Sequence, residues 1–415
     1  MRSYDIIIVG AGPAGMSAAI AASREDLEIL LLEGSEKIGR KILVTGNGKC
    51  NLTNVYQDIT CYRSDTPDKV QKVLDLFGPA ETAGFFRNLG ILTRDRNGYI
   101  YPYNEQASTV RTAFESYIRG KDNITVMTGC HVDEVLPVKD GFDIHTGKGN
   151  FFSPAVVLTT GGYAGPSIGC DGSGYYMAGK VGHELIPTYP ALTALKSSAP
   201  FLKKVKGVRN QAKITLNIDG RAFLSESGEL QWTDYGISGV AVFQLSRYAV
   251  KALEERKKVS LSLDFLQEMD KQELYEYLCG QIKDCGYKDA GEIVMGFLPE
   301  KLTPVVLREA GLSIGDKLNR LAPERLYDLV ASIKSFPLRI NGYVGYEKAQ
   351  VTMGGVSLKE VTDHLESSLH RGLYFAGEIL DVDGTCGGYN LQWAFSSGNV
   401  SGKAAASYIT NMRRS

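Results

Sequence analysis

The chain has 415 residues, of which 43% are hydrophobic and 22% are charged. These values are typical of a folded globular protein with room for two or three domains. Lys and Arg number 46 against 47 Asp and Glu. This balance lacks the electrostatic footprint of a protein that binds nucleic acid or an anionic membrane, so we expect neither partner.

The first apolar run, Ile6–Val9, is too short for a signal peptide. No stretch approaches the ~20 apolar residues that a membrane span needs. Seven cysteines lie at positions 50, 61, 130, 170, 279, 285 and 386, with no C-x-x-C pair. We interpret them as mostly buried thiols of a reducing compartment and predict a cytoplasmic protein. No Cys and His cluster has the spacing of a metal site, so no metal is predicted.

Residues 4–33 show a strand, a glycine turn, a helix, a second strand and an acid, in that order. The apolar run at 4–9 is typical of a strand buried on both faces of a parallel sheet. The turn GAGPAG follows at 10–15, and the alanine-rich segment after it favours a helix. A second apolar run at 27–32 ends in Glu33. This order predicts a dinucleotide-binding unit.

Each part of this unit has a physical role. Gly10 permits the tight turn, Gly12 lets the backbone approach a pyrophosphate, and Gly15 lets the helix pack closely on the strand. The helix N-terminus offers free N–H groups to the phosphates. Glu33 can accept hydrogen bonds from an adenosine ribose, which argues against a 2′-phosphorylated adenosine. The alternative is a tight turn in an α/β domain without a nucleotide.

Three later segments favour FAD over NAD, and the first is GRKILVTGNGKCNLTN at 39–54. Its cations Arg40 and Lys41 are expected near the phosphates. Gly46 and Asn47 begin a Gly-Asn-Gly run that can adopt positive φ and let the backbone pass close to a flat ring. A nicotinamide dehydrogenase does not usually need such a wrap at this point. A surface loop of no particular role is the alternative.

The second segment is the apolar run at 154–162, which reads as a buried strand that ends in Thr160 and Gly161 beside the cofactor. The runs at 124–127 and 130–135 are expected to be strands of the same sheet, with Val132 covering the adenine. We therefore place these strand ends on the FAD side of the predicted sheet.

The third segment, at 372–383, begins with an expected strand that ends in Gly377 and Glu378, and it also contains Asp383. A helix is expected from 390 to 409, with its N-terminus at the flavin ring. A helix dipole there stabilises negative charge on the reduced flavin. The predicted FAD domain is thus built from both ends of the chain.

The pattern of apolar and polar residues changes in the middle of the chain. Alternation over 212–218 followed by Asp219 and Gly220 predicts a β-hairpin. The basic run at 201–206 is interpreted as a solvated loop or strand edge. We expect an FAD-binding domain made of residues 1–190 and 350–415. Between its two parts we expect a β-rich insertion at 191–265 and a helical insertion at 266–349. No second nucleotide unit is visible, so NAD(P)H would be a transient electron donor.

Several blocks, including GNGKCNLTN and GGYNLQWAFSSG, resemble the BaiN/YhiN-like FAD-dependent oxidoreductases over residues 4–402. This resemblance implies an α/β fold, namely a glutathione-reductase-type Rossmann FAD-binding domain with an inserted β-barrel-like and helical substrate region. Family members include 3-dehydro-bile acid Δ4,6-reductase-like and aminoacetone oxidase-like proteins. The matched motifs imply FAD contacts at Ala14, Glu33, Arg40, Val132, Glu378, Asn390 and Leu391. Asp234 and Val240 depart from the family pattern, and both lie in the insertion.

The expected function is hydride transfer between FAD and a small organic substrate. The first hypothesis is reduction of an activated C=C bond, as in a bile-acid-like enone, with NAD(P)H as donor. The alternatives are an amine or aminoketone oxidase that uses oxygen, and an FAD-binding protein that modifies or binds RNA. Each candidate acid, base or nucleophile also has a structural reading, so no catalytic residue is assigned among Cys50, His183, Asp234, Tyr235, Cys386 and Tyr389. The sequence does not set the oligomeric state.

Overall fold

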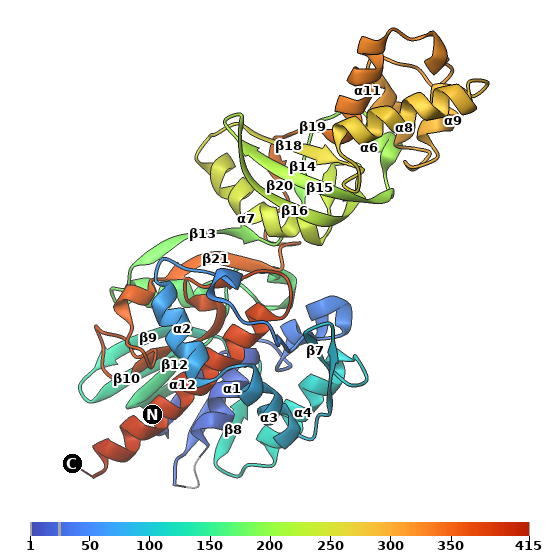
Figure 1. Ribbon diagram of the computed structural model, residues 1–415. Helices are drawn as coiled ribbons and strands as arrows, with labels where there is room; N and C mark the ends of the chain where they lie inside the picture. The colour runs from blue at the N-terminus through green and yellow to red at the C-terminus, as the bar shows by residue number, and fades with distance from the viewer. Residues whose placement is uncertain (1, 24–25, 415) are drawn as a thin grey trace. The chain divides into compact units, whose positions relative to one another are not determined.

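The computed structural model describes residues 2–23 and 26–414 (Figure 1). The chain forms two compact units. The first combines the residues up to Tyr189 with those from Gln350 onward, and the second is Pro190–Ala349. Each unit is described by itself. Among the described residues, no helix has both the length and the apolar character to cross a bilayer.

A five-stranded parallel sheet forms the centre of the first unit. Its strands, in spatial order, are β22 (Leu373–Phe375), β12 (Ala155–Leu158), β2 (Ile6–Val9), β3 (Ile29–Leu32) and β8 (Ile124–Met127). Every residue of β2, β3 and β12 is buried, as expected for strands that are covered on both faces. This parallel sheet confirms the fold class predicted from the apolar runs.

Helices α1 (Pro13–Ala22) and α12 (Tyr389–Met412) bring the two ends of the chain together and lie side by side (Figure 1). Their backbones approach closely because α12 carries glycine at the contact. A Cβ at Gly398 would lie 2.2 Å from the Ala14 oxygen, and one at Gly402 would lie 2.3 Å from the Ala18 oxygen. The Ser17 hydroxyl also donates to the α12 backbone at Phe395. Larger residues would force the helices apart.

Two smaller sheets flank this core, one mixed and one antiparallel. One has the order β1 (Arg2–Ser3), β11 (Gly149–Ser153), β10 (Gly141–Thr146) and β9 (Val132–Val138), in which β1 runs parallel to β11. The other has the order β4 (Thr53–Asn54), β7 (Tyr99–Pro102) and β6 (Thr93–Arg96). The prediction that residues 130–135 share a sheet with 124–127 is therefore wrong. β9 pairs with β10, along which burial alternates as in a strand with one solvated face.

Short elements complete the first unit. They are the 3₁₀ segment η1 (Arg40–Gly48), helices α2 (Pro67–Leu76), α3 (Pro79–Asn88), α4 (Ala107–Arg119) and α5 (Ser173–Lys180), and the strand pairs β5 (Tyr62–Arg63) with β23 (Asp383–Gly384) and β13 (Leu185–Ala191) with β21 (Val351–Val356). Within η1, Gly46 and Asn47 have φ of 55° and 57°, so the predicted left-handed backbone is present.

The second unit contains a seven-stranded antiparallel sheet. Its order is β19 (Phe336–Ile340), β18 (Val259–Asp264), β15 (Arg209–Ile218), β16 (Arg221–Trp232), β17 (Gly236–Ser238), β14 (Leu195–Lys196) and β20 (Gly342–Tyr343). The β15–β16 hairpin closes at Asp219 and Gly220, whose φ values are 50° and 79°. This turn confirms the hairpin predicted from the Asp-Gly dipeptide.

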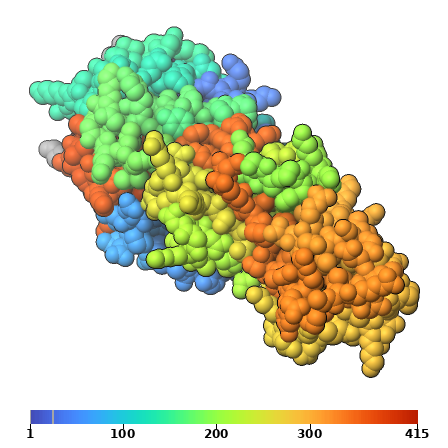
Figure 2. Space-filling view, turned by 90° about the horizontal axis from the view of Figure 1, so that it is seen from above, coloured from blue at the N-terminus to red at the C-terminus, as the bar shows by residue number. Residues whose placement is uncertain are grey.

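The helices of the second unit are α6 (Leu202–Val205), α7 (Val240–Glu254), α8 (Lys271–Asp284), α9 (Ala290–Val294), α10 (Thr303–Glu309) and α11 (Pro323–Lys334). Residues 271–334, coloured yellow to orange, gather at one end of this unit (Figure 2). The basic run at 201–206 is not a loop or strand edge. It forms α6, because Leu202 and Val205 lie one turn apart and both are buried.

The cysteines differ from expectation in burial. All seven are free thiols, but only Cys50, Cys130 and Cys170 are buried, and Cys279 is exposed. The expectation of mostly buried thiols is therefore wrong. The reason is local, because Cys279 and Cys285 lie in and just after α8, whose buried positions are Leu274 and Leu278.

Candidate functional site

The glycine turn between β2 and α1 has the geometry of a phosphate cradle. Gly10 has φ of 101°, and a Cβ there would lie 2.7 Å from the Thr159 oxygen. A Cβ at Gly15 would lie 1.8 Å from the Gly10 oxygen. Around Gly12, in contrast, no heavy atom among the described residues lies within 4 Å of an added Cβ. The turn is thus closed against the protein at Gly10 and Gly15 and open at Gly12. A pyrophosphate needs this arrangement beside a helix N-terminus.

Glu33 follows β3 and lies beside this turn. Its Oε2 accepts a hydrogen bond from the Ala11 nitrogen at 2.9 Å, and its Oε1 accepts one from the Ser35 nitrogen at 2.8 Å. Each carboxylate oxygen has a further lone pair for a ribose hydroxyl. The sequence pattern predicts the ribose role of Glu33 but does not reveal that this side chain also fixes the turn.

The two cations that begin η1 bind different segments. Arg40 donates to the Ser35 hydroxyl at 3.2 Å and to the Ser167 carbonyl at 3.0 Å. Lys41 lies 2.5 Å from an oxygen of Glu378. Burial disfavours the charged form of Lys41, but the Glu378 carboxylate outweighs this effect and the pKa of Lys41 lies above its usual value. Two residues predicted separately as cofactor contacts therefore neutralise each other.

Helix α12 holds the segment that contains Glu378. The Trp393 indole donates to the Gly377 carbonyl at 3.1 Å, and the Gly377 nitrogen donates to the Ser397 hydroxyl at 2.9 Å. The second oxygen of Glu378 accepts from the Thr352 nitrogen at 2.9 Å. The carboxylate of Glu378 thus has partners within the chain on both oxygens. Its contact with a cofactor stays a prediction.

The end of β12 presents one hydroxyl without a partner. Thr159 supports the glycine turn, because its hydroxyl bonds to the Val9 and Gly10 carbonyls. The next residue, Thr160, has a buried Oγ1 with no hydrogen-bond partner among the described residues. Gly161 has φ of 76°, and an added Cβ there would meet no described atom within 4 Å. The Thr160 hydroxyl lies close to α5, since a Cβ at Gly174 would lie 1.8 Å from it, whereas Gly161 is open. A buried polar atom without a partner beside an open glycine is compatible with a ligand at this strand end.

A second unpaired group lies at the N-terminus of α12. A Cβ at Gly388, the residue before the helix, would lie 2.9 Å from the Thr53 oxygen and 3.0 Å from Asn51 Oδ1. Asn51 is 8% exposed, and its Oδ1 has no partner among the described residues. Sequence reasoning did not single out Asn51. The available signal was an asparagine between the apolar residues Cys50 and Leu52 in a buried segment.

The remaining predicted contacts have structural partners of their own. Asn390 donates to the Gly384 carbonyl at 2.9 Å and accepts from the Gly384 nitrogen at 2.7 Å. Asp383 is buried in β23, and Val132 is buried at the start of β9. Asn390 and Leu391 form the first turn of α12, where backbone N–H groups lack intrahelical partners. Any contact of these two residues with an anionic ring atom would therefore run through the backbone.

Three of the candidate catalytic groups lie in surroundings that do not activate them for catalysis. Burial raises the pKa of the Cys50 thiol to about 12, which removes the thiolate needed for nucleophilic attack. His183 is buried between Glu360 at 3.0 Å and Ser367 at 2.8 Å. Burial also raises the pKa of Tyr389, whose ring packs edge-on against Tyr62. Their phenol, thiol and imidazole groups are parts of the packed structure.

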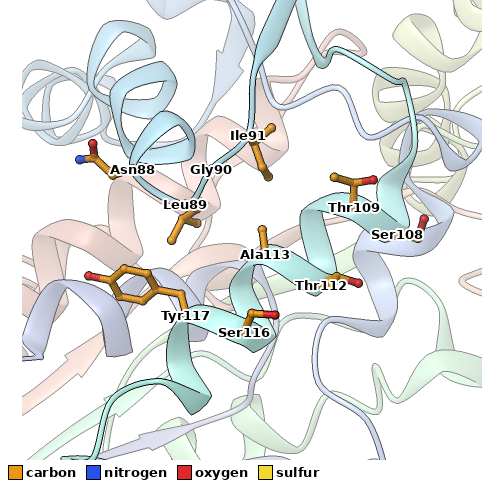
Figure 3. A pocket seen from close by; sticks show the side chains of 10 residues that line it. All are labelled: Asn88, Leu89, Gly90, Ile91, Ser108, Thr109, Thr112, Ala113, Ser116 and Tyr117. Atoms are coloured by element: carbon orange, nitrogen blue, oxygen red, sulfur yellow. The ribbon is translucent and has the colours of Figure 1, made fainter.

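The two candidates in the second unit are also accounted for. Asp234 pairs with Lys206 at 2.6 Å on the surface, and Tyr235 is exposed. A pocket of about 600 Å³ in the first unit lies between α3 and α4 (Figure 3). It is lined mainly by small and hydroxyl side chains, and none of the predicted cofactor residues lines it. We assign no chemistry to these three places.

Comparisons with known proteins agree with this geometry. The model of the family described as HI0933-like protein Rossmann domain matches residues 4–404. The chain belongs to the HI0933-like family. This membership confirms the resemblance seen in the motifs.

The chain is also similar to two curated proteins and to a solved structure. The chain is 41% identical to the 3-dehydro-bile acid delta(4,6)-reductase of Clostridium scindens, over 96% of this chain and 98% of that protein. It is 30% identical to the ribosomal RNA dihydrouridine synthase of Escherichia coli, over 96% of each chain. An Escherichia coli quinol fumarate reductase structure matches 99% of this chain and 72% of its own, with a TM-score of 0.52 and 16% identity. The last likeness shows the fold alone. With this family membership, the chain is an oxidoreductase.

Proposed function

We propose that this HI0933-like protein binds FAD and reduces a C=C bond that is conjugated to a carbonyl group. The open face of Gly12 between the closed Gly10 and Gly15 carries the cofactor part of this proposal. The glycine turn and the N-terminus of α1 would hold the pyrophosphate, and Glu33 would hold the adenosine ribose. Thr160 and Asn51 supply buried polar atoms that await partners.

The cofactor supplies, in its reduced form, a hydride for the electron-poor carbon of the substrate. The chain supplies position and electrostatics. The first turn of α12 directs unpaired N–H groups and a positive dipole end outward, which favours negative charge at that point. The Lys41–Glu378 pair ties η1 to the segment before α12, so the two walls of the site hold their spacing.

The names of the relatives support the reaction type. A 3-dehydro-bile acid with double bonds at positions 4 and 6 is a conjugated ketone, and uridine becomes dihydrouridine when its C=C bond next to a carbonyl is saturated. The two printed names thus describe one kind of reduction on different molecules. We propose a small unsaturated ketone as substrate, because the relative of that kind is 41% identical against 30% for the other. NAD(P)H is the proposed donor, acting transiently.

Reoxidation of the reduced enzyme tests this function. The FAD-loaded protein is reduced anaerobically with NADH or NADPH and then mixed with a steroid 4-en-3-one, with an imine or with oxygen. We expect the oxidised flavin spectrum to return fastest with the enone, together with the saturated ketone as product. Fast return with oxygen and release of peroxide would instead establish an oxidase.

Ribosomal RNA is the second candidate substrate, and the relative from Escherichia coli is the observation that favours it. The test is the dihydrouridine content of RNA after incubation with the reduced enzyme. Formation of dihydrouridine with no turnover of the enone would overturn the small-molecule proposal. The net charge of −1 supports the small molecule.

A further inference from the structure

One face of the three-stranded sheet β4–β7–β6 carries alternating aromatic and basic side chains. Arg96 is the direct partner of Tyr99 across the strands, and Arg94 is the partner of Tyr101. Directly opposed residues of antiparallel strands point to the same face, so these four side chains form one surface. We call it the Tyr–Arg face. Tyr99 is 41% exposed, and the side chain of Arg96 is 51% exposed.

Positive charge is in excess on this face. Three cations surround the carboxylate of Glu105, with Lys49 at 3.2 Å, Arg94 at 3.3 Å and Arg96 in direct contact. One carboxylate neutralises one of these charges, and two remain. The Arg94 guanidinium also lies 4.2 Å from the centre of the Tyr103 ring. A group of cations held in this way is ready to bind an anion without further ordering of its side chains.

The Tyr–Arg face adjoins both segments that border the proposed cofactor site. A Cβ at Gly387, just before α12, would lie 3.3 Å from the Tyr99 ring, and one at Gly46 in η1 would lie 3.9 Å from the Tyr101 ring. Asn54 of β4 donates to the Gly387 carbonyl at 3.2 Å. The face therefore begins at the N-terminus of α12 and leads away from it along β7.

We propose that the Tyr–Arg face binds the anionic end of the substrate, while the carbonyl-conjugated end lies by the N-terminus of α12. This inference rests on the proposed function and adds a substrate class, namely unsaturated ketones that carry a carboxylate or phosphate.

The number of cations favours such a molecule over RNA. Proteins that bind RNA or DNA neutralise many phosphates along an extended basic surface. Here three cations share one carboxylate, and the two remaining positive charges suffice for one carboxylate or one phosphate but not for a row of phosphates. The tyrosines supply flat apolar surface for the rings of the same molecule.

Binding to the full-length FAD-loaded protein tests this proposal. The probes are a steroid 4-en-3-one with a side-chain carboxylate, its phosphate ester counterpart, its uncharged methyl ester and the saturated acid, all measured by equilibrium dialysis. In Arg96→Gln we expect about tenfold weaker binding of the acids and less than twofold change for the methyl ester. The carboxylate and phosphate probes show which anion the face prefers. Rising salt should weaken only the charged probes.

Arg87→Gln is the matched control, because Arg87 is an exposed arginine on α3 outside this face. Equal loss of acid and ester binding in Arg96→Gln, or no loss of either, would overturn the proposal. Loss of binding to a uridine-rich oligonucleotide with unchanged acid binding would overturn it in favour of RNA. The saturated acid cannot be reduced, so its binding reports on the face even if the protein has no enone reductase activity.

Discussion

The Lys41 ammonium lies 2.5 Å from a carboxylate oxygen of Glu378, and this contact joins segments 337 residues apart. Both side chains are mostly buried, with exposed fractions of 21% and 18%. An uncompensated charge at such a place is costly, since water cannot replace the lost partner. The ion pair therefore holds η1 against the segment before α12.

We expect Glu378→Gln to lower the free energy of unfolding by about 2 kcal/mol, because it leaves the Lys41 charge without its counter-charge. Urea unfolding of the FAD-depleted protein measures this effect. The control is Asp363→Asn, which breaks the exposed Lys72–Asp363 pair and should cost less than about 1 kcal/mol. Equal stability of the two variants would show that Lys41 and Glu378 do not act as a buried pair.

Substitution of the glycine turn separates folding from cofactor binding. Gly12→Ala adds a Cβ that meets no described atom within 4 Å, at a φ of −77° that alanine adopts easily. We expect an apoprotein of unchanged stability whose affinity for FAD falls at least about tenfold, because the methyl group takes the place of the pyrophosphate. Isothermal titration of the apoprotein with FAD measures the affinity.

Gly15→Ala is the contrasting variant. Its Cβ would lie 1.8 Å from the Gly10 oxygen, so α1 must move away from β2. Overpacking of this kind costs about 1–3 kcal/mol or more, and we expect this variant to lose thermal stability even without FAD. An unstable Gly12→Ala protein would contradict the open position that the structure gives to Gly12.

Glu33 should contribute to FAD affinity through the adenosine ribose. A hydrogen bond to a charged group is worth ~1.5–3 kcal/mol, so Glu33→Ala should weaken FAD binding by about ten- to a hundredfold. Because Glu33 also bonds to the Ala11 and Ser35 nitrogens, part of this loss reflects the turn. Titration with AMP in place of FAD isolates the ribose end. A variant that stays as yellow as the wild type after dialysis, beside a Glu28→Ala control, would refute the ribose role.

Sequence alone predicts the parts of this fold that depend on local pattern. The run Ile6–Val9 and the glycine spacing predict β2, the turn and α1, because an apolar run and a glycine each act over a few residues. The start of α12 is predicted at Asn390 and observed at Tyr389. The sheet that Val132 joins is predicted wrongly, since strand pairing depends on partners far along the chain.

The contacts of the candidate site are harder to predict than its position. Lys41 and Glu378 each occur in a motif that indicates cofactor binding, but nothing local shows that they pair with each other. The same limit applies to the Asn51 oxygen and the Thr160 hydroxyl, because a missing partner is visible only when all neighbours are placed. The cofactor contacts themselves stay predictions that the variants above test.

Cys50 should be an unreactive thiol in the native protein, and its burial should make protein stability depend on pH above pH 9. Its pKa of about 12 in the folded protein lies above the usual value of 9.0. As pH rises from 9 towards 12, the unfolded chain releases the proton and the folded protein keeps it. Stability is therefore full below pH 9 and falls as pH rises, by at most about 1.4 kcal/mol per pH unit for one group.

Urea unfolding at pH 8.5 and 10.5 should show a smaller pH dependence for Cys50→Ala than for the wild type. Cys279→Ala is the control, since that thiol is exposed. Native protein treated with iodoacetamide at pH 9 should be modified at Cys279 and not at Cys50. Rapid labelling of Cys50 would contradict its burial and its raised pKa.

Thr160 offers a test in which apoprotein and cofactor complex should respond in opposite directions. Its buried Oγ1 has no partner among the described residues, so the hydroxyl brings a desolvation cost to the apoprotein. Thr160→Val removes the hydroxyl at almost constant shape. We expect the variant apoprotein to be as stable as the wild type or more stable, by up to about 1 kcal/mol.

If the bound cofactor supplies the missing partner, FAD affinity should fall about five- to tenfold. Thr159→Val is the control, since the Thr159 hydroxyl bonds to the Val9 and Gly10 carbonyls and its loss should destabilise the apoprotein. If Thr160→Val destabilises the apoprotein and leaves FAD binding unchanged, the hydroxyl has a partner within the chain and does not face the cofactor.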